Sequence, residues 1–152
     1  MAGQTTTAQP TTAQPTTAQP TTAPRGGGGG VMFLRISVAL QTLSLFFQAT
    51  TAGLLLTSAL GETLHGVGAR VMYGASMLYV LAAVLAWRPG GGSPRPVLYA
   101  SGFLVLASVQ VVLGIAHVPS AHVPLGVLMF GLSVLDLGRL LTARPAAVSS
   151  VS

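Results

Sequence analysis

The sequence predicts an all-α integral membrane protein: a four-helix up-down bundle made of two similar helical hairpins, preceded by a disordered N-terminal tail. Three observations lead to this fold class. Seven basic and two acidic residues are the only charged ones, which is 6% of the chain, whereas soluble domains have about 25%. Hydrophobic residues make up 51% of the chain, and most of them lie in four long segments. A soluble surface needs more charge, and the apolar segments exclude a wholly disordered chain.

The first 30 residues are predicted to be a disordered tail. They repeat the motif TTAQP, and its prolines are not tolerated inside helices or central strands. The glycine run at 26–30 is typical of a flexible linker. A second interpretation is that translation starts at Met32 and that the repeat is not part of the protein. A short C-terminal tail is predicted over 145–152.

The membrane domain is predicted over 31–144. About 20 helical residues cross a hydrocarbon core of about 30 Å, and each of the four apolar segments is at least that long. The expected helices cover 31–59, 66–87, 97–116 and 122–142. Glycines and prolines separate most of them, and short connections favour antiparallel neighbours. The chain is therefore expected to cross the lipid bilayer four times.

Arginine supplies all the basic charge, and its distribution predicts the orientation. Six arginines flank helix ends that fall on one side of the bundle, and only Arg70 lies near the other side. The six are Arg25, Arg35, Arg88, Arg95, Arg139 and Arg144. The positive-inside rule then places both chain termini in the cytoplasm and the protein in the cell membrane. Arginines spread beside apolar runs also argue against nucleic-acid binding, despite a net charge of +5.

The second and fourth expected helices match each other without a gap. The matched stretches are His65-x6-Met72-Tyr73-Gly74-Ala75-Ser76 and His122-x6-Met129-Phe130-Gly131-Leu132-Ser133. A weaker echo relates the first and third helices, through Gln48 and Gly53 on one and Gln110 and Gly114 on the other. We interpret these matches as a duplicated hairpin, related by an axis along the membrane normal. Chance similarity between helices rich in small residues is the alternative.

The repeat places one histidine at the outer end of each hairpin. Residues four, seven and eleven positions after each histidine share its helix face. If both faces point inward, His65 and His122 meet at one depth, where two imidazoles can ligate a haem iron from both sides. The small residues Ala69 and Gly126 would then let a flat macrocycle approach the helix backbones.

Two charged residues belong to the same candidate site. Glu62 lies three residues before His65, where its carboxylate is expected to accept the proton of the ring nitrogen that does not bind iron. Arg70 is suited to pairing with a haem propionate. The alternative is that both histidines are interfacial residues without a ligand. In that case Arg70 extends to the membrane surface and pairs with Glu62 or with lipid phosphate.

The third histidine and the polar stripe of the first helix are expected to be structural. His117 is expected to be an interfacial residue, with replacement of His122 as ligand as the alternative. The stripe is expected to hydrogen-bond to neighbouring helices, and lining a ligand or proton path is the alternative. It consists of Gln41, Ser44, Gln48 and Thr51.

Enzyme chemistry finds little support in the sequence. Asp136 is the only acid inside a helix, which in a membrane suggests function, but Arg139 three residues later is expected to pair with it. The chain contains no cysteine, which excludes disulfides, thiolate zinc sites, iron–sulfur clusters and cysteine nucleophiles. No Walker loop, catalytic triad or metalloprotease motif is present.

The two hairpins resemble one half of haem A synthase. Glu62-Thr-Leu-His65 resembles the Glu-x-x-His motif of that family at the outer start of the second helix. On the second hairpin, the similar residues are Gln110-Val-Val-Leu-Gly114 followed by His122. The likeness covers about residues 40–142. It implies a four-helix bundle with haem-ligating histidines on the second and fourth helices.

Two departures limit what this resemblance implies. Gly66 stands where the family usually has arginine after the first histidine, and the second bundle of the family is missing. The resemblance therefore implies single-haem binding rather than synthase activity. The chain is also similar to small four-helix membrane proteins of unknown function from high-GC Gram-positive bacteria, whose composition it shares in using arginine without lysine.

These observations lead to one principal functional hypothesis and two competing ones. The principal hypothesis is a multi-pass membrane protein that binds one haem b through His65 and His122 near the outer face, for electron transfer or haem handling. The second is a cofactor-free scaffold subunit that assembles with a membrane protein partner or as a homo-oligomer. The third is a small transporter subunit that uses Asp136.

Overall fold

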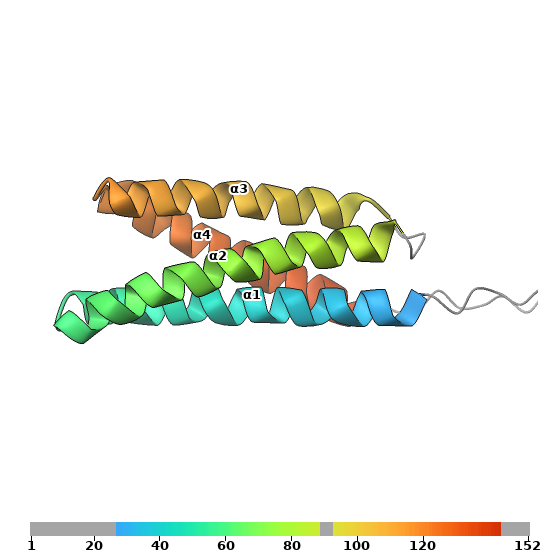
Figure 1. Cartoon of the computed structure of the whole chain (residues 1–152), viewed down its shortest axis with the longest axis horizontal. Helices are drawn as coiled ribbons and strands as arrows, with labels where there is room; N and C mark the ends of the chain where they lie inside the picture. The colour runs from blue at the N-terminus through green and yellow to red at the C-terminus, as the bar shows by residue number, and fades with distance from the viewer. Residues whose placement is uncertain (1–26, 89–92, 144–152) are drawn as a thin grey trace, which may run out of the picture.

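The protein is a bundle of four long helices, as predicted (Figure 1). The computed structural model describes residues 27–88 and 93–143, so most of the expected N-terminal tail and all of the C-terminal one lie outside the described residues. The helices are α1 (Gly27–Leu55), α2 (Ala59–Trp87), α3 (Arg95–Ile115) and α4 (Pro119–Thr142). Each is long and apolar enough to cross a membrane. The chain is therefore a multi-pass membrane protein by helix length and hydropathy.

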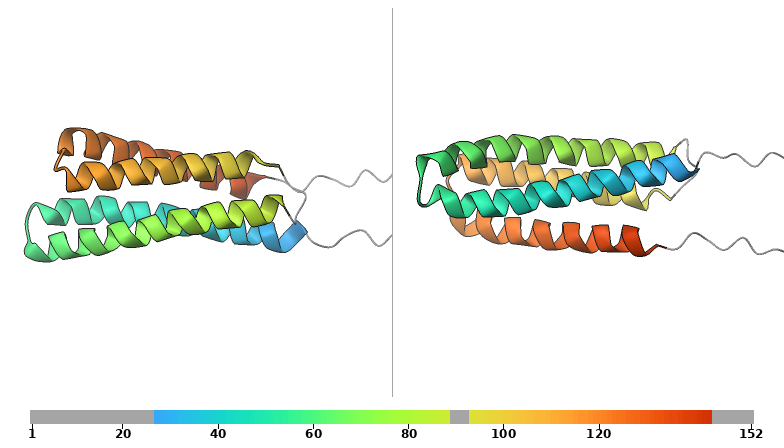
Figure 2. Two further views of the ribbon diagram at one scale, coloured as in Figure 1. Left: turned by 45° about the horizontal axis from the view of Figure 1, so that its top comes forward. Right: turned by 90° about the horizontal axis from the view of Figure 1, so that it is seen from below.

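Consecutive helices run antiparallel, and each packs against two others. Helix α1 lies against α2 and α4, and α3 also lies against α2 and α4. In the described residues, the diagonal pairs α1–α3 and α2–α4 make no close backbone approach. Figure 2 shows the same arrangement from two further sides, with the start of α1 and the end of α4 at one end of the bundle. Side chains that meet between α2 and α4 therefore meet across the centre of the bundle.

The turn between the first two helices is shorter than predicted. The first helix ends at Leu55 rather than at residue 59, and the second begins at Ala59 rather than at residue 66. The reason is a cap: the Ser58 side chain accepts a hydrogen bond of 3.1 Å from the backbone N–H of Gly61. A second hairpin turn is equally short, because α4 begins at Pro119, a residue whose fixed φ suits the first turn of a helix.

The first helix begins earlier than the sequence suggested. Residues 27–30 of the expected glycine linker are helical and belong to α1. Gly30 lies directly against α2, since a Cβ atom added to it would be 3.3 Å from the Cα atom of Ala86. Helix α1 thus extends into a segment that composition alone marks as a linker, and Gly30 contacts α2 there.

Two clusters of buried side chains form the core. One contains Leu34, Val38, Tyr79, Ala82, Ala83 and Ala100. The other contains Leu45, Met72, Phe103, Ala107 and Met129. Outside the core, large apolar side chains remain exposed along every helix, Leu43, Leu98 and Val127 among them. Apolar surface of this extent implies contact with lipid chains rather than with water.

The antiparallel order brings the described arginines at helix ends to one end of the bundle. Arg35 near the start of α1, Arg88 after α2, Arg95 at the start of α3 and Arg139 near the end of α4 share that end (Figure 1). Glu62 belongs to the first turn of α2 at the opposite end. The cytoplasmic assignment of the arginine-rich end remains a prediction.

Candidate functional site

The matched faces of α2 and α4 both point into the bundle, as expected. On α2, Met72 and Ser76 are buried, and on α4, Met129 and Ser133 are buried. Because these positions lie seven and eleven residues after the two histidines, each histidine occupies the N-terminal end of a buried stripe on its helix. The two stripes belong to diagonal helices and face each other across the core.

His65 and His122 meet at the end of this central column that lies away from the arginine-rich end of the bundle. Their ring centroids are 6.2 Å apart, and the ring planes make an angle of 65°. Both residues are half-buried. Each comes from a different hairpin, so the pair forms only when the two hairpins pack together.

A backbone carbonyl holds the His122 ring. Its Nδ1 atom lies 3.1 Å from the carbonyl oxygen of Gln110 on α3. Gly114 lies against the ring, since a Cβ atom added there would be 3.4 Å from the Cε1 atom of His122. Gln110 and Gly114, which the sequence comparison of the two hairpins had already singled out, therefore both contact the His122 ring.

A side-chain hydroxyl holds the His65 ring. Its Nδ1 atom lies 3.2 Å from Oγ1 of Thr51, a buried residue of α1. The expected partner was Glu62, and that expectation is wrong. Glu62 is exposed in the first turn of α2, where a negative charge is favourable to the helix dipole. Thr51 was expected only to be part of a structural stripe.

The small residues of the predicted site lie on the inward faces, whereas its arginine does not. Ala69 and Gly126 are half-buried, and a Cβ atom on Gly126 would be 2.8 Å from Nε2 of Gln110. Arg70 is exposed. It follows His65 by five residues, which is about 140° around a helix. The expected interaction of Arg70 with a group between the histidines is therefore not supported by its position.

His117 has a structural role in the turn between α3 and α4. It is exposed and has a φ of 53°, in the left-handed region. Its backbone N–H donates to Gly114 and that of Val118 donates to Leu113, which is the hydrogen-bond pattern of a Schellman cap. His117 thus ends α3, and its expected place at the membrane interface stays a prediction.

The polar stripe of α1 behaves as expected at two positions and differently at a third. Gln41, buried in the core, accepts a hydrogen bond of 3.1 Å from Ser76, and Thr51 contacts His65. Ser44 instead donates to the carbonyl of Leu40 in its own helix.

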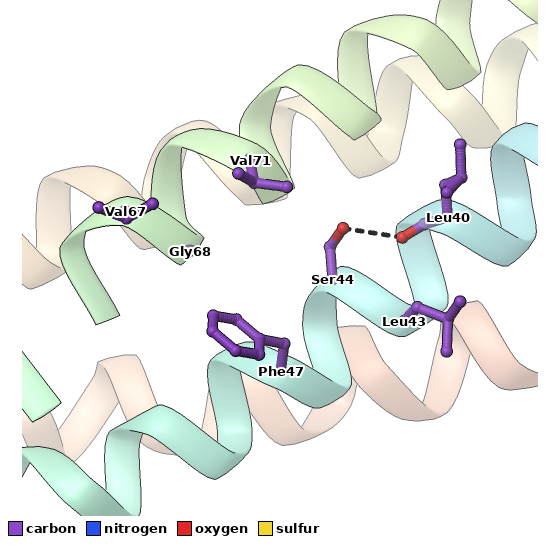
Figure 3. Close-up of a pocket in the computed structure, with 7 residues that line it drawn as sticks. All are labelled: Leu40, Leu43, Ser44, Phe47, Val67, Gly68 and Val71. Atoms are coloured by element: carbon purple, nitrogen blue, oxygen red, sulfur yellow. Dashed lines mark hydrogen bonds between the residues drawn. The ribbon is translucent and has the colours of Figure 1, made fainter. Parts of the chain in front are cut away.

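Ser44 also lines a shallow external groove between α1 and α2 with a volume of about 330 Å³ (Figure 3). The other lining residues are Leu40, Leu43, Phe47, Val67, Gly68 and Val71. This groove contains neither histidine and its lining is apolar.

Asp136 has a different partner from the one predicted. The hydroxyl of Tyr79 on α2 donates to its carboxylate across the bundle, while Arg139 is exposed. Tyr79 lies fourteen residues after His65, and Asp136 lies fourteen residues after His122. The central column thus has a polar pair near each end. The Tyr79–Asp136 contact was missed because sequence spacing reveals only partners within one helix.

The site offers two imidazoles and a few neutral hydrogen-bonding groups. Among residues 27–88 and 93–143, no three histidine, aspartate or glutamate side chains gather as a metal-binding cluster. Gln110 adds one further feature: its Oε1 atom is buried and has no hydrogen-bond partner.

Comparison with protein-family models, with curated proteins and with solved structures gave no match. Any functional conclusion therefore rests on the geometry of the His65–His122 pair.

Proposed function

We propose that the protein binds one haem b between His65 and His122, near the outer face of the membrane, and uses it for electron transfer or haem handling. The proposal is carried by the distance between the His65 and His122 rings, together with the hydrogen bond that each ring makes through its Nδ1 atom. When bound, the haem would supply one-electron redox chemistry. The residues of this chain would hold and orient it.

The ring separation supports ligation of one metal from two sides. Metal–imidazole bonds are about 2.0–2.1 Å long, and a ring nitrogen lies about 1 Å from the ring centre. Two imidazoles on opposite sides of one metal therefore have centroids roughly 6 Å apart. The observed 6.2 Å between His65 and His122 fits this requirement. Packing of two unrelated aromatic rings spans a broader range, about 4.5–7 Å.

The hydrogen bonds at Nδ1 also support the proposal. Histidine ligands usually engage the ring nitrogen that does not bind metal in a hydrogen bond, which fixes the orientation of the ring. In both His65 and His122 the engaged atom is Nδ1. This arrangement leaves Nε2 of each ring available for the metal.

The surroundings suit a flat and largely apolar group. Ala69 and Gly126 contribute at most a methyl group beneath the histidines, the Gln110 amide packs against Gly126, and Met72 and Met129 are buried below them. The unpartnered Oε1 atom of Gln110 adds a polar contact for a bound group or for a water molecule. The chain contains three histidines, and His117 serves the turn, so the proposal is limited to one bis-histidine haem.

The proposal is tested by the absorption spectrum of the protein purified in detergent from haem-supplied cells. We expect sharp Soret and α bands in the reduced-minus-oxidised spectrum, as is typical of six-coordinate low-spin haem. His65→Ala and His122→Ala are each expected to abolish the low-spin bands. His117→Ala is the matched control and is expected to leave them unchanged.

A colourless, well-folded protein would refute the haem proposal. Such a protein that co-purified with a membrane partner would support the scaffold function instead. Low-spin bands that survived both His65→Ala and His122→Ala would show that haem binds elsewhere.

A further inference from the structure

We propose that the protein binds one phospholipid molecule at a defined place on its surface, with the lipid phosphate paired to Arg70 and one acyl chain in the groove between α1 and α2. This site lies outside the histidine pair and requires no haem, so it goes beyond the proposed function. Two observations lead to it. One is an arginine inside a membrane span, for which the chain supplies no acidic partner. The other is an apolar groove beside that arginine.

Arg70 lies well inside the second membrane span. It follows the first residue of α2 by eleven positions, which is about 16 Å along a helix. Its side chain is exposed on the surface of the bundle, and in a membrane this surface contacts lipid. A guanidinium group among lipid chains is unfavourable unless it reaches a polar partner. Arg70 therefore needs an anion within reach of its side chain.

The acidic residues of the chain are not placed to supply this anion. There are only two, Glu62 and Asp136. The carboxylate of Asp136 accepts a hydrogen bond from Tyr79 near the arginine-rich end of the bundle. Glu62 lies eight residues before Arg70, about 12 Å along the same helix. Side chains on a helix tilt toward its N-terminus, so Glu62 extends away from Arg70.

The same tilt directs Arg70 toward the lipid phosphates. Helix α2 begins at the end of the bundle that holds the histidine pair, so the long side chain extends toward the membrane surface at that end. Arginine side chains lay their aliphatic part along apolar surface and carry the charged group to the interface. A guanidinium group binds a phosphate through two parallel hydrogen bonds. A phosphate of the adjacent lipid leaflet is thus the anion that Arg70 reaches.

The apolar groove lies beside Arg70 on α2. Val67 and Val71, three residues before and one residue after the arginine, form the α2 side of the groove. Its volume of about 330 Å³ is at the lower end of the range for small-molecule sites, about 300–1,000 Å³. Ser44 is the only polar side chain in the lining, and its hydroxyl donates to the carbonyl of Leu40 (Figure 3). The lining therefore suits a hydrocarbon chain, because its one hydroxyl donor is already satisfied.

The groove is a slot on the surface, because α1 and α2 are in contact beneath it. A Cβ atom on Gly68 would lie 2.9 Å from Cε1 of Phe47 and 2.3 Å from Oε1 of Gln48. An acyl chain is narrow enough to lie in such a slot, whereas a helix with its side chains is about 10–12 Å wide. A second copy of this chain would also have to bring an acid to Arg70, and its own acids lie near the helix ends. A phospholipid combines a narrow apolar chain with a phosphate in one molecule, which matches both observations.

The experiment uses the full chain in phosphatidylcholine vesicles that contain a small amount of phosphatidylglycerol with a photoactivatable diazirine in one acyl chain. After illumination, peptide mass spectrometry locates the labelled residues. We expect the label to concentrate on 40–47 of α1 and 67–71 of α2. Diacylglycerol with the same diazirine chain but no phosphate is expected to label these segments about fivefold less. Uniform labelling of the lipid-facing surfaces of all four helices, or equal labelling by the two probes, would overturn the proposal.

Four variants test the two parts of the site separately. Arg70→Gln is expected to lower labelling of the groove by phosphatidylglycerol about fivefold, whereas Arg70→Lys keeps the positive charge and is expected to retain most of it. Val71→Phe is expected to abolish labelling, because the larger ring fills the groove. Val127→Phe is its matched control, since Val127 is exposed on α4 and lies outside the groove. Unchanged labelling in both Arg70→Gln and Val71→Phe would contradict the proposed site.

A second copy of the chain is the competing occupant, and a cysteine detects it. Leu43 lines the groove and is 65% exposed, and the natural chain has no cysteine. We expect Leu43→Cys to remain monomeric under oxidising conditions in the same vesicles. A disulfide-linked dimer in high yield would assign the groove to a second copy and overturn the lipid site.

Discussion

At the scale of single residues, Asp136 is an acidic side chain within a helix long and apolar enough to cross the membrane. A charged or strongly polar side chain inside a bilayer is unfavourable unless another group satisfies it. The chain satisfies it with Tyr79, which is 2% exposed and donates its hydroxyl to the carboxylate from across the bundle. This contact ties α2 to α4, two helices whose backbones do not approach each other closely.

Tyr79→Phe is expected to destabilise the bundle by about 1–3 kcal/mol, because it leaves a half-buried carboxyl group without its donor. The free energy of unfolding is measurable in mixed micelles through the fluorescence of Trp87, which is the only tryptophan of the chain. Tyr99→Phe is the control, since Tyr99 is 54% exposed. Equal stabilities of the two variants would show that the Tyr79–Asp136 contact contributes nothing.

The sequence predicted which faces of the helices are buried but not which residues pair. Helical spacing correctly predicted that Met72 and Ser76 point inward, because spacing determines which residues share a face of their helix. The same spacing suggested Glu62 for His65 and Arg139 for Asp136, which are neighbours along one helix. The actual partners, Thr51 and Tyr79, come from other helices. Contacts between helices depend on how the helices pack, and residue spacing within one helix does not predict that packing.

At the scale of elements, the turn between α1 and α2 depends on Gly61. A Cβ atom at this position would lie 2.3 Å from the backbone carbonyl atoms of Leu54, so the end of α1 would have to move. The same residue supplies the backbone N–H that donates to the Ser58 side chain, and any residue except proline would supply it. Gly61 thus allows the close approach of the two helices at this turn.

Gly61→Ala is expected to destabilise the protein by about 1–3 kcal/mol through this clash. Gly74→Ala provides a matched control in the same helix, since Gly74 is exposed and has nothing within 4 Å of an added Cβ atom. That change is expected to raise stability by about 0.5–1 kcal/mol, because alanine favours the helix over glycine. Unfolding in mixed micelles distinguishes the two, and an equal effect at both positions would contradict the proposed close approach.

Helix number and approximate position were predictable, whereas helix ends were not. Hydropathy averages over about 20 residues, so it locates a membrane span without resolving its ends. The start of α2 was predicted seven residues late because the polar residues around Glu62 were read as a loop. Ser58 was the available signal, since serine followed by a helical pattern is typical of an N-cap.

At the scale of the whole molecule, the distribution of charge defines two different ends. The arginines of the described helix ends gather at one end, and Arg35 there donates a hydrogen bond of 3.0 Å to the carbonyl of Leu140 near the end of α4. The histidine pair lies at the other end. The proposed haem site and the arginine-rich end would therefore face opposite sides of the membrane.

The expected orientation is testable with single cysteines, because the natural chain has none. Thr57→Cys lies in the turn between α1 and α2, and Ser93→Cys lies before α3 at the arginine-rich end. We expect a membrane-impermeant maleimide to label Thr57→Cys in intact cells and Ser93→Cys only after lysis. The unmodified protein is the control for background labelling. The reverse pattern would invert the assignment of the two ends.

The diagonal placement of His65 and His122 has a consequence for how the molecule is held together. Each hairpin contributes one imidazole, so a group that bridges them resists separation of the hairpins. Ligand binding and hairpin association are then thermodynamically linked: a ligand at 100 times its dissociation constant adds about 2.7 kcal/mol to the stability of the assembled bundle. A bound ligand would therefore hold the two hairpins together at the end of the bundle where short turns connect the helices.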